Sequence, residues 1–392
     1  MRPILLSTVG TSLFFPNLAG LKRTLDDDVA KPVDRRSFTD DQRAVAEELI
    51  PAYATEDWSS VAQLLGLLPS DHRACGAEIN SITSLRKHAY IPSNAGLYFF
   101  HSDTDDGRAI ADVLVRYYRA CGHAPVEAVP IPDLQDKDPK RFRTHGLRNL
   151  AKLICSKINA HGADACAFNA TGGYKAQVAV AVLLGQALGI PVYYMHERFS
   201  EIIAFPPLPV SLDFEVWMRA SGLLQVLERE TSPVARTVFD DDEWDERYES
   251  LVETVLIDGV QFVELSAAGQ IFHETFRERF RSQRDRVLPP AAIKKLDPVL
   301  HDHGVTNLLK VELTRYLTTV TNALPGVTRC VTNYCNPQLN DPTRFRVKGE
   351  EVQGIYTDGT RTVKFLVETT ATTSGQRSAV VAALNEWLRA QQ

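Results

Sequence analysis

The sequence predicts a doubly wound α/β fold for residues 1–210, because short apolar segments alternate there with helical segments. We expect strands near the N-terminus and at 95–100, 126–131, 165–168 and 192–195. Helices are expected up to about Cys121 and over 147–158. Strands that alternate with helices form a parallel sheet covered on both faces.

Two of the expected strands run into glycine turns, Ser7–Leu13 (S-T-V-G-T-S-L) and Asn169–Lys175 (N-A-T-G-G-Y-K). Glycine permits tight turns, and the amides at a helix start favour a phosphate. Because ligands bind beyond the carboxyl ends of parallel strands, both turns are expected to line one polar pocket. Its candidate residues are Gly10, Thr11, Ser12, Asn169, Thr171, Gly172, Gly173 and Lys175. Neither turn is a dinucleotide fingerprint or a Walker loop.

The remaining polar residues of the first 210 give weaker signals. Residues 14–94 form a mostly helical insertion to which the sequence assigns no chemistry. His101 and Asp103 follow a strand and are candidates for the same pocket, although we favour their interpretation as turn formers. His196 and Glu197 follow the last strand, either as pocket residues or as a strand-edge pair.

Length and composition indicate a multidomain protein of the cytoplasm. A chain of 392 residues predicts two or three domains, and no apolar run is long enough to span a bilayer. The six cysteines lack C-x-x-C spacing, so we expect free thiols and no metal site. The net charge is −6, yet basic residues outnumber acidic ones in 284–392, which is compatible with an RNA-contacting domain.

Residues 211–286 change pattern and predict a smaller middle module. The acids 240–243 precede an expected helix over 244–255, and 260–265 alternate as a strand. Ser266 is expected to cap a helix that carries phenylalanines at i, i+4 spacing. This order resembles a winged helix-turn-helix module. Because the first helix is acidic, we favour a spacer and dimerisation role over DNA binding.

The pattern of residues 287–392 predicts an α+β domain. Pro289-Pro290 ends the preceding helix and marks the boundary. Helices are expected at 291–301, 305–320 and 379–388, and strands at 344–348, 352–357 and 362–367. In the first of these strands Arg344, Arg346 and Lys348 alternate with apolar residues, so one face is cationic. From this strand alone, an edge strand whose cations discourage aggregation is the better interpretation than a catalytic site.

The glycine turns, together with Tyr193–Phe199 (Y-Y-M-H-E-R-F) and Ile202–Pro209 (I-I-A-F-P-P-L-P), resemble the CRISPR-associated Rossmann-fold (CARF) sensor domains. The resemblance covers residues 1–210. It implies a homodimer that binds a cyclic oligoadenylate across its two-fold axis. It also implies that the sensor cleaves its own ligand in some members, a second expectation for this chain.

Residues 287–392 resemble the RelE family of ribosome-dependent mRNA interferases in element order and in the basic strand. The resemblance implies a metal-independent RNase in which basic side chains stabilise the phosphorane. Arg344, Arg346 and Lys348 match the family's basic strand, and Arg377 lies near a later arginine. The chain departs from the family at Gln353 and in the lack of a C-terminal tyrosine.

The combined hypothesis is an ancillary effector of a type III CRISPR system. Cyclic tetraadenylate would act as its allosteric activator, with no cofactor, and the partners would be the ribosome and mRNA. The alternative is a CARF-containing, DNA-binding transcription regulator. An HEPN ribonuclease is disfavoured because Arg116 and His123, which have its spacing, lie in the sensor. A restriction-like nuclease is disfavoured because no lysine follows Glu368 at the required spacing.

Overall fold

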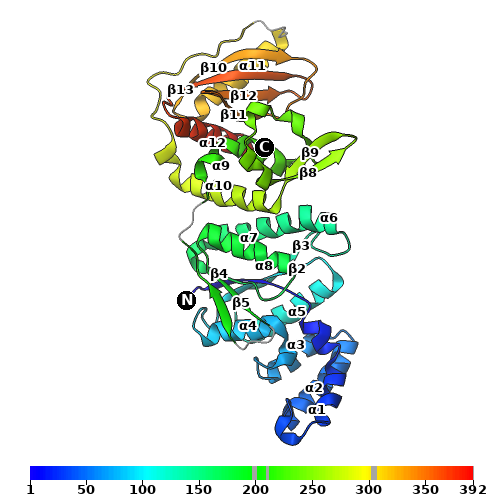
Figure 1. Ribbon diagram of the computed structural model, residues 1–392. Coiled ribbons are helices and arrows are strands. Elements are labelled where there is room, and N and C mark those ends of the chain that lie inside the picture. The colour runs from blue at the N-terminus through cyan, green and yellow to red at the C-terminus, as the bar shows by residue number, and fades with distance from the viewer. Residues whose placement is uncertain (197–200, 209–211, 302–306, 392) are drawn as a thin grey trace. The chain divides into compact units, whose positions relative to one another are not determined.

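The computed structural model describes residues 1–392 except 197–200, 209–211, 302–306 and 392. The chain divides into two compact units, unit 1 (Met1–Ser211) and unit 2 (Leu212–Gln392). Figure 1 labels their helices and strands.

Unit 1 is built on a sheet in the order β3-β2-β1-β4-β5-β6. Its strands are β1 Ile4–Thr8, β2 Gly96–Ser102, β3 Val126–Ile131, β4 Cys166–Asn169, β5 Val192–Met195 and β6 Ile202–Phe205. Strands β1 to β5 are parallel, and β6 is antiparallel to β5. The five predicted strands and the α/β fold of this part are confirmed.

Helices cover both faces of this sheet, as in a doubly wound fold. They are α1 Leu21–Val29, α2 Asp40–Ala54, α3 Trp58–Leu67, α4 Gly76–Lys87, α5 Asp105–Ala120, α6 Pro139–Arg141, α7 Leu147–His161 and α8 Lys175–Leu188. Figure 1 shows α4 and α5 on one face, and α7 and α8 on the other. The helical character predicted for 14–94 is confirmed by α1 to α4.

The strand order reverses at β1, which pairs with β2 on one side and with β4 on the other. From β1 the chain builds outward to β2 and β3, and then crosses back to β4. Such a reversal places the ends of two neighbouring strands beside a crevice, which is where ligands bind in open α/β sheets. The two predicted glycine turns follow β1 and β4 and therefore meet at this point.

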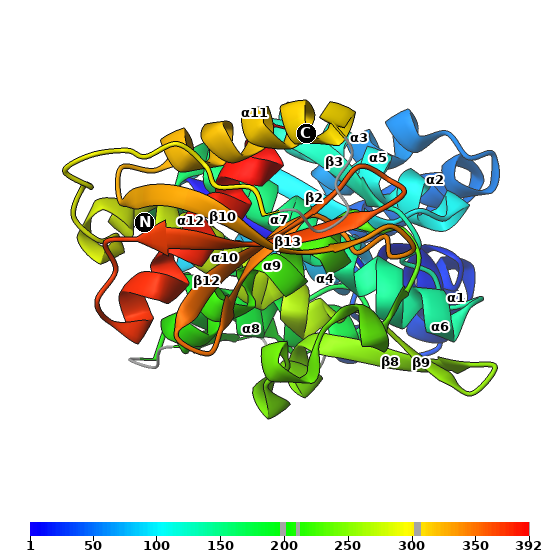
Figure 2. The same cartoon turned by 90° about the horizontal axis from the view of Figure 1, so that it is seen from above.

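Unit 2 contains a four-stranded antiparallel sheet, β10-β13-β12-β11, and a small sheet, β7-β9-β8. Figure 2 shows β10, β13 and β12 side by side, with α11 along them. The strands are β7 Val234–Ala235, β8 Val252–Ile257, β9 Val260–Leu265, β10 Val327–Asn336, β11 Arg344–Lys348, β12 Glu351–Thr357 and β13 Thr362–Thr369. The helices are α9 Phe214–Arg229, α10 Ala267–Val287, α11 Asn307–Ala323 and α12 Ser374–Ala390.

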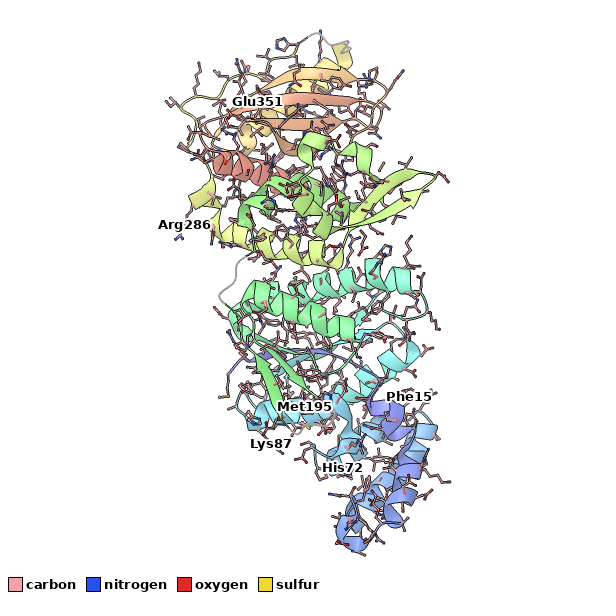
Figure 3. The ribbon with its side chains drawn as sticks, in the orientation of Figure 1. Phe15, His72, Lys87, Met195, Arg286 and Glu351 are labelled. Atoms are coloured by element: carbon pink, nitrogen blue, oxygen red, sulfur yellow. The ribbon has the colours of Figure 1, made fainter. Side chains whose placement is uncertain are left out.

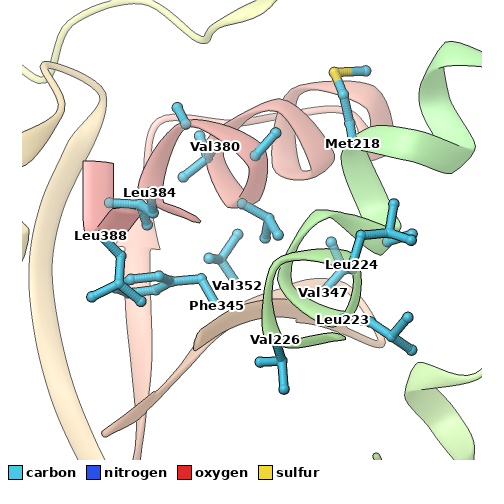
Figure 4. Close-up of a cluster of buried hydrophobic side chains, with 14 of the residues drawn as sticks. Met218, Leu223, Leu224, Val226, Phe345, Val347, Val352, Val380, Leu384 and Leu388 are labelled. Atoms are coloured by element: carbon cyan, nitrogen blue, oxygen red, sulfur yellow. The ribbon is translucent and has the colours of Figure 1, made fainter. Parts of the chain in front are cut away.

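One apolar core runs through unit 2 and joins α9 to the four-stranded sheet and α12. Figure 4 shows Leu224 of α9, Phe345 of β11 and Leu384 of α12 in this cluster. The side-chain amide of Asn385 accepts from the Phe345 N–H and donates to the Phe345 carbonyl, both at 2.9 Å. The Asn385 amide thus pairs with the backbone N–H and C=O of Phe345 at the open edge of β11, as a neighbouring strand would. Segments that the sequence assigned to two modules share one core.

Two predicted helices of unit 2 are wrong. The segment 244–255 holds a short 3-10 turn, Glu246–Leu251, followed by strand β8, because its β-branched residues pair with β9. Residues 291–301 are extended and run beside β10, with the Val299 N–H donating to the Cys330 carbonyl at 3.0 Å. Proline at 289, 290 and 298 opposes a helix there. Helix α9 and strand β10 are not predicted from the sequence.

The predicted start of α10 is confirmed, since Ser266 Oγ accepts from the Gly269 N–H at 3.0 Å. All six cysteines are free thiols, as expected. Across the part of the chain that the structure describes, helices are too short or too polar to cross a bilayer.

Candidate functional site

A cavity of about 310 Å³ lies beyond the ends of β1 and β4. It is lined by both glycine turns, by the end of β5 and by the start of the insertion, namely Gly10, Thr11, Ser12, Phe15, Pro16, Asn17, Arg73, Gly76, Ala77, Asn80, Thr171, Gly172, Gly173, Tyr194 and Met195. Figure 3 labels Phe15 and Met195 of this group. The volume lies at the lower end of the range found for small-molecule sites.

The two glycine turns touch each other through their backbones. A Cβ on Gly10 would lie 2.6 Å from the Gly173 nitrogen, and a Cβ on Gly172 would lie 2.8 Å from the Gly10 nitrogen. Gly173 also has a φ of +98°, which favours glycine. The Thr8 hydroxyl donates to the Gly172 carbonyl and ties the turns together. Glycine is required at Gly10 and Gly172 because a side chain would separate the two turns.

Hydroxyl and amide groups beneath the turns hold them in place. The Asn169 side chain donates to Ser7 Oγ at 3.1 Å and to Ser81 Oγ at 2.8 Å. It also accepts from the Thr171 hydroxyl at 2.7 Å, and Thr171 Oγ1 in turn accepts from the Met195 N–H at 3.1 Å. This chain of hydrogen bonds fixes the end of β4 to α4 on one side and to β5 on the other.

The structure therefore brings together most of the predicted ligand-binding residues. Those that line the cavity are Gly10, Thr11, Ser12, Thr171, Gly172 and Gly173. Asn169 is buried beneath them and positions the turn. Lys175, the first residue of α8, is exposed and lies outside the residues that line this cavity.

The insertion forms the wall that the sequence analysis missed. Arg73, Ala77 and Asn80 line the cavity from the beginning of α4 and the turn before it. Ser12 Oγ accepts from the Ala77 N–H at 3.1 Å, and the Asn17 side chain donates to the Arg73 carbonyl at 2.9 Å. Figure 3 labels His72, directly before this wall. No local pattern marks these residues, because their place in the site depends on how α4 packs against residues 13–18 and β5.

Glu78 is a buried acid under the first glycine turn. Its Oε1 accepts from the Gly10 N–H at 2.7 Å, while Oε2 has no hydrogen-bond partner among the described residues. Burial raises the pKa of the Glu78 carboxyl above its ordinary value of 4.5, although the bond from Gly10 opposes the shift. Burial therefore disfavours the charged form of this carboxyl beneath the cavity.

Other polar residues considered from the sequence lie elsewhere. His101 is buried against the Ser102 carbonyl, and Asp103 pairs with Arg108 near the start of α5. Burial lowers the pKa of His101. His196 follows β5 but does not line the cavity, and Glu197 lies outside the described residues.

The two residues of the disfavoured HEPN spacing also have local contacts. Arg116 pairs with Asp112 of its own helix at 2.9 Å. His123 Nδ1 is 2.8 Å from the Ala95 carbonyl in the interior. These contacts hold both side chains within unit 1.

In unit 2 the predicted catalytic arginines are buried in an ionic cluster. The side chains of Arg344 and Arg346 are 1% and 2% exposed, and both lie 3.0 Å from Glu243 Oε2. Arg346 also pairs with Asp240 and donates to Gln353 Oε1 at 3.0 Å. Burial alone would lower the pKa of Arg346, but the two carboxylates outweigh it and raise the pKa. Both arginines are thus neutralised by the acidic segment 240–243 in this conformation.

The lysines of the same sheet face are more accessible. Lys348 is 43% exposed, with Nζ 4.0 Å from Asp240 Oδ2. Lys364 of β13, which the sequence analysis did not select, lies 3.7 Å from the same carboxylate and 5.6 Å from the centre of the Tyr334 ring. Arg377 is on α12, and none of the described contacts joins it to this cluster. The register places Arg344, Lys364 and Tyr334 in one row across the sheet.

Comparison with known families finds a similarity in unit 1. Residues 73–208 match a family described as CRISPR-associated protein (Cas_APE2256). The matched range begins at Arg73 and includes the second glycine turn. No curated protein matches the chain. The similarity supports an association with CRISPR systems and leaves unit 2 outside the matched range.

We expect Gly172→Ala to destabilise unit 1 by about 1–3 kcal/mol, as overpacking does in tight interiors. The new Cβ would lie 2.0 Å from Glu78 Oε1 and 2.9 Å from the Thr8 carbonyl oxygen. Urea unfolding measures the change. Gly66→Ala is the control, because a Cβ on Gly66 of α3 meets nothing within 4 Å. Equal stability of the two variants would contradict the close contact.

We expect Glu78→Gln to change how stability depends on pH. The folded-state pKa of Glu78 is raised above 4.5, so the wild type loses stability as pH rises from 4.5 through the folded pKa. The glutamine variant, which resembles the protonated acid, loses less over the same range. Urea unfolding at several pH values compares the two proteins. Parallel curves would show that Glu78 ionises as freely as in the unfolded chain.

We expect Glu243→Gln to lower the free energy of unfolding by about 3 kcal/mol, because it removes the charge that two buried arginines share. Glu246→Gln is the matched control, since Glu246 is exposed on the following turn. Thermal and urea unfolding of the full chain provide the measurement. A loss as small as that of the control would contradict the role of Glu243 as the counter-charge of both arginines.

Proposed function

We propose that unit 1 senses a cyclic oligoadenylate and that unit 2 is a ribonuclease controlled by this ligand in a CRISPR-associated response. The observation that carries the sensor proposal is the meeting of both glycine turns around one cavity at the strand reversal of the sheet. The similarity of residues 73–208 to CRISPR-associated proteins supports it. The resemblance of both turns to CARF sensors supplies the class of ligand.

The size of the cavity supports a shared ligand. A volume of about 310 Å³ is at the lower end for one small molecule, and a ring of four nucleotides is larger than that. A two-fold dimer offers two identical pockets, so a symmetric ring can place equivalent groups in both. We therefore propose cyclic tetraadenylate as the ligand of a homodimer.

The proposed cleavage uses the basic face of the four-stranded sheet. An attack by the RNA 2′-hydroxyl builds negative charge on a pentavalent phosphorus, and fixed cations that bind this state best lower the barrier. Lys348 of β11 provides exposed charge, and the partly buried Lys364 of β13 and the buried Arg346 lie on the same face. Ribosome dependence follows if the ribosome supplies the mRNA geometry that this face lacks.

The acidic segment 240–243 constrains this proposal. Asp240 lies within 4.0 Å of the Nζ of both Lys348 and Lys364, and it also pairs with Arg346. A phosphate cannot take the same positions while Asp240 occupies them. Activation therefore includes withdrawal of this segment from β11, and a ligand that favours the withdrawn state drives it.

A DNA-binding regulator is the less favoured alternative. The β8–β9 hairpin, which would be its wing, exposes Leu256, Ile257 and Val260 at its end. Contact with a DNA backbone relies on basic side chains rather than apolar ones. Salt-dependent DNA binding without RNA cleavage would nevertheless move the assignment to a regulator.

The decisive experiment is mRNA cleavage in a purified translation system, with and without cyclic tetraadenylate and with and without ribosomes. We expect cuts only when both are present. Lys348→Gln should reduce the rate by about 100-fold, as loss of one group that stabilises a developing charge does. The exposed Lys294→Gln variant should leave it unchanged.

Each of the other outcomes would reject a different part of the proposed function. Cleavage of naked RNA that depends on the ligand would preserve the sensor and reject the dependence on ribosomes. Equal rates for Lys348→Gln and the wild type would remove the basic strand from the site. The absence of cleavage in every arm would reject the nuclease. Chromatography of the ligand after incubation would show whether unit 1 also degrades it.

A further inference from the structure

The insertion contributes a charged side chain, Arg73, to the lining of the cavity. Among the described residues that line the cavity, Arg73 is the only one with a charged side chain. The other lining residues offer hydroxyls, amides, backbone groups and apolar surface. A polyanionic ligand in this cavity therefore meets a full positive charge at Arg73, whereas Lys175 lies outside the lining.

The guanidinium of Arg73 is available for a ligand. It is exposed, and within the described ranges no ion pair or hydrogen bond of its guanidinium occurs. Other arginines of unit 1 differ, since Arg43, Arg108 and Arg116 are each paired with an aspartate. Arg73 can therefore bind an incoming anion without first breaking an ion pair.

The backbone that carries Arg73 is held firmly to the first glycine turn. Asn17 donates to the Arg73 carbonyl, the Ala77 N–H donates to Ser12 Oγ, and the Gly10 N–H donates to Glu78. These three contacts join the segment 73–80 to residues 10–17. A group placed by a fixed backbone loses less freedom when it binds, which favours affinity.

We propose that Arg73 binds a phosphodiester of the ligand and thereby sets affinity for the ring, a role that rests on the proposed sensor function. A guanidinium donates two parallel hydrogen bonds to the oxygens of a phosphate, which a lysine cannot do. The insertion thus supplies the phosphate contact, while the glycine turns shape the space beside it. Contact with a phosphate makes the affinity sensitive to salt and indifferent to the identity of the base.

Calorimetric titration of the full chain with cyclic tetraadenylate tests this role. Arg73→Gln should weaken binding by about 10- to 100-fold, the range for a hydrogen bond to a charged group. Arg73→Lys should recover part of the loss, because it restores the charge without the fork. Arg23→Gln is the matched control, since Arg23 lies on α1 of the same insertion and is 89% exposed.

Two further readings separate a phosphate contact from a structural effect. Thermal unfolding without ligand should be the same for Arg73→Gln and the wild type. The affinity of the wild type should fall more steeply with salt than that of Arg73→Gln, because screening acts on the charge that the variant lacks.

The failure of this inference differs from the failure of the proposed function. If the wild type binds the ring and Arg73→Gln binds it equally well, the role of Arg73 is wrong and the sensor stands. If the wild type binds no cyclic tri-, tetra- or hexaadenylate, the sensor proposal falls, and this role for Arg73 falls with it.

Discussion

The candidate sensor site depends on the backbone contact between Gly10 and the pair Gly172-Gly173. Two strand ends can approach this closely only where both turns lack side chains, and only where their strands are neighbours in the sheet. The contact also explains the burial of Glu78, because its Oε1 lies where a Cβ of Gly172 would be. The cavity, its floor and the fixed end of β4 all follow from this approach.

The insertion supplies the part of the cavity lining that the glycine turns do not form. The turns give shape, backbone groups and hydroxyls, but the charged side chain in the lining comes from Arg73, outside either motif. The sheet has the strand order of dinucleotide-binding proteins in β3-β2-β1-β4-β5, but the cavity at its strand reversal is lined in part by the insertion. The site is therefore a product of two parts of the chain that are distant in sequence and joined by three hydrogen bonds.

In unit 2, by contrast, the arginines of the most basic strand, β11, are already paired with acidic side chains. Burial of Arg344 and Arg346 requires counter-charges, and Glu243 and Asp240 provide them. A side chain that stabilises the fold through a buried pair is not at the same time free to stabilise a phosphorane. The exposed Lys348 and the partly buried Lys364 of that face also lie near Asp240, so the acidic residues that stabilise the buried arginines also limit access of a ligand to the basic face.

The sequence by itself determined the parallel strands, the glycine turns and the polar pocket they form, because strand alternation and glycine conformation are local properties. It wrongly predicted helices at 244–255 and 291–301. In both segments, hydrogen bonds to a neighbouring strand outweighed the helical spacing of the apolar residues. Only the tertiary structure decided that Arg73 joins the site, that Lys175 does not, and that the arginines of β11 are buried. Those outcomes depend on which distant surfaces meet, and residue spacing along the chain carries no record of that.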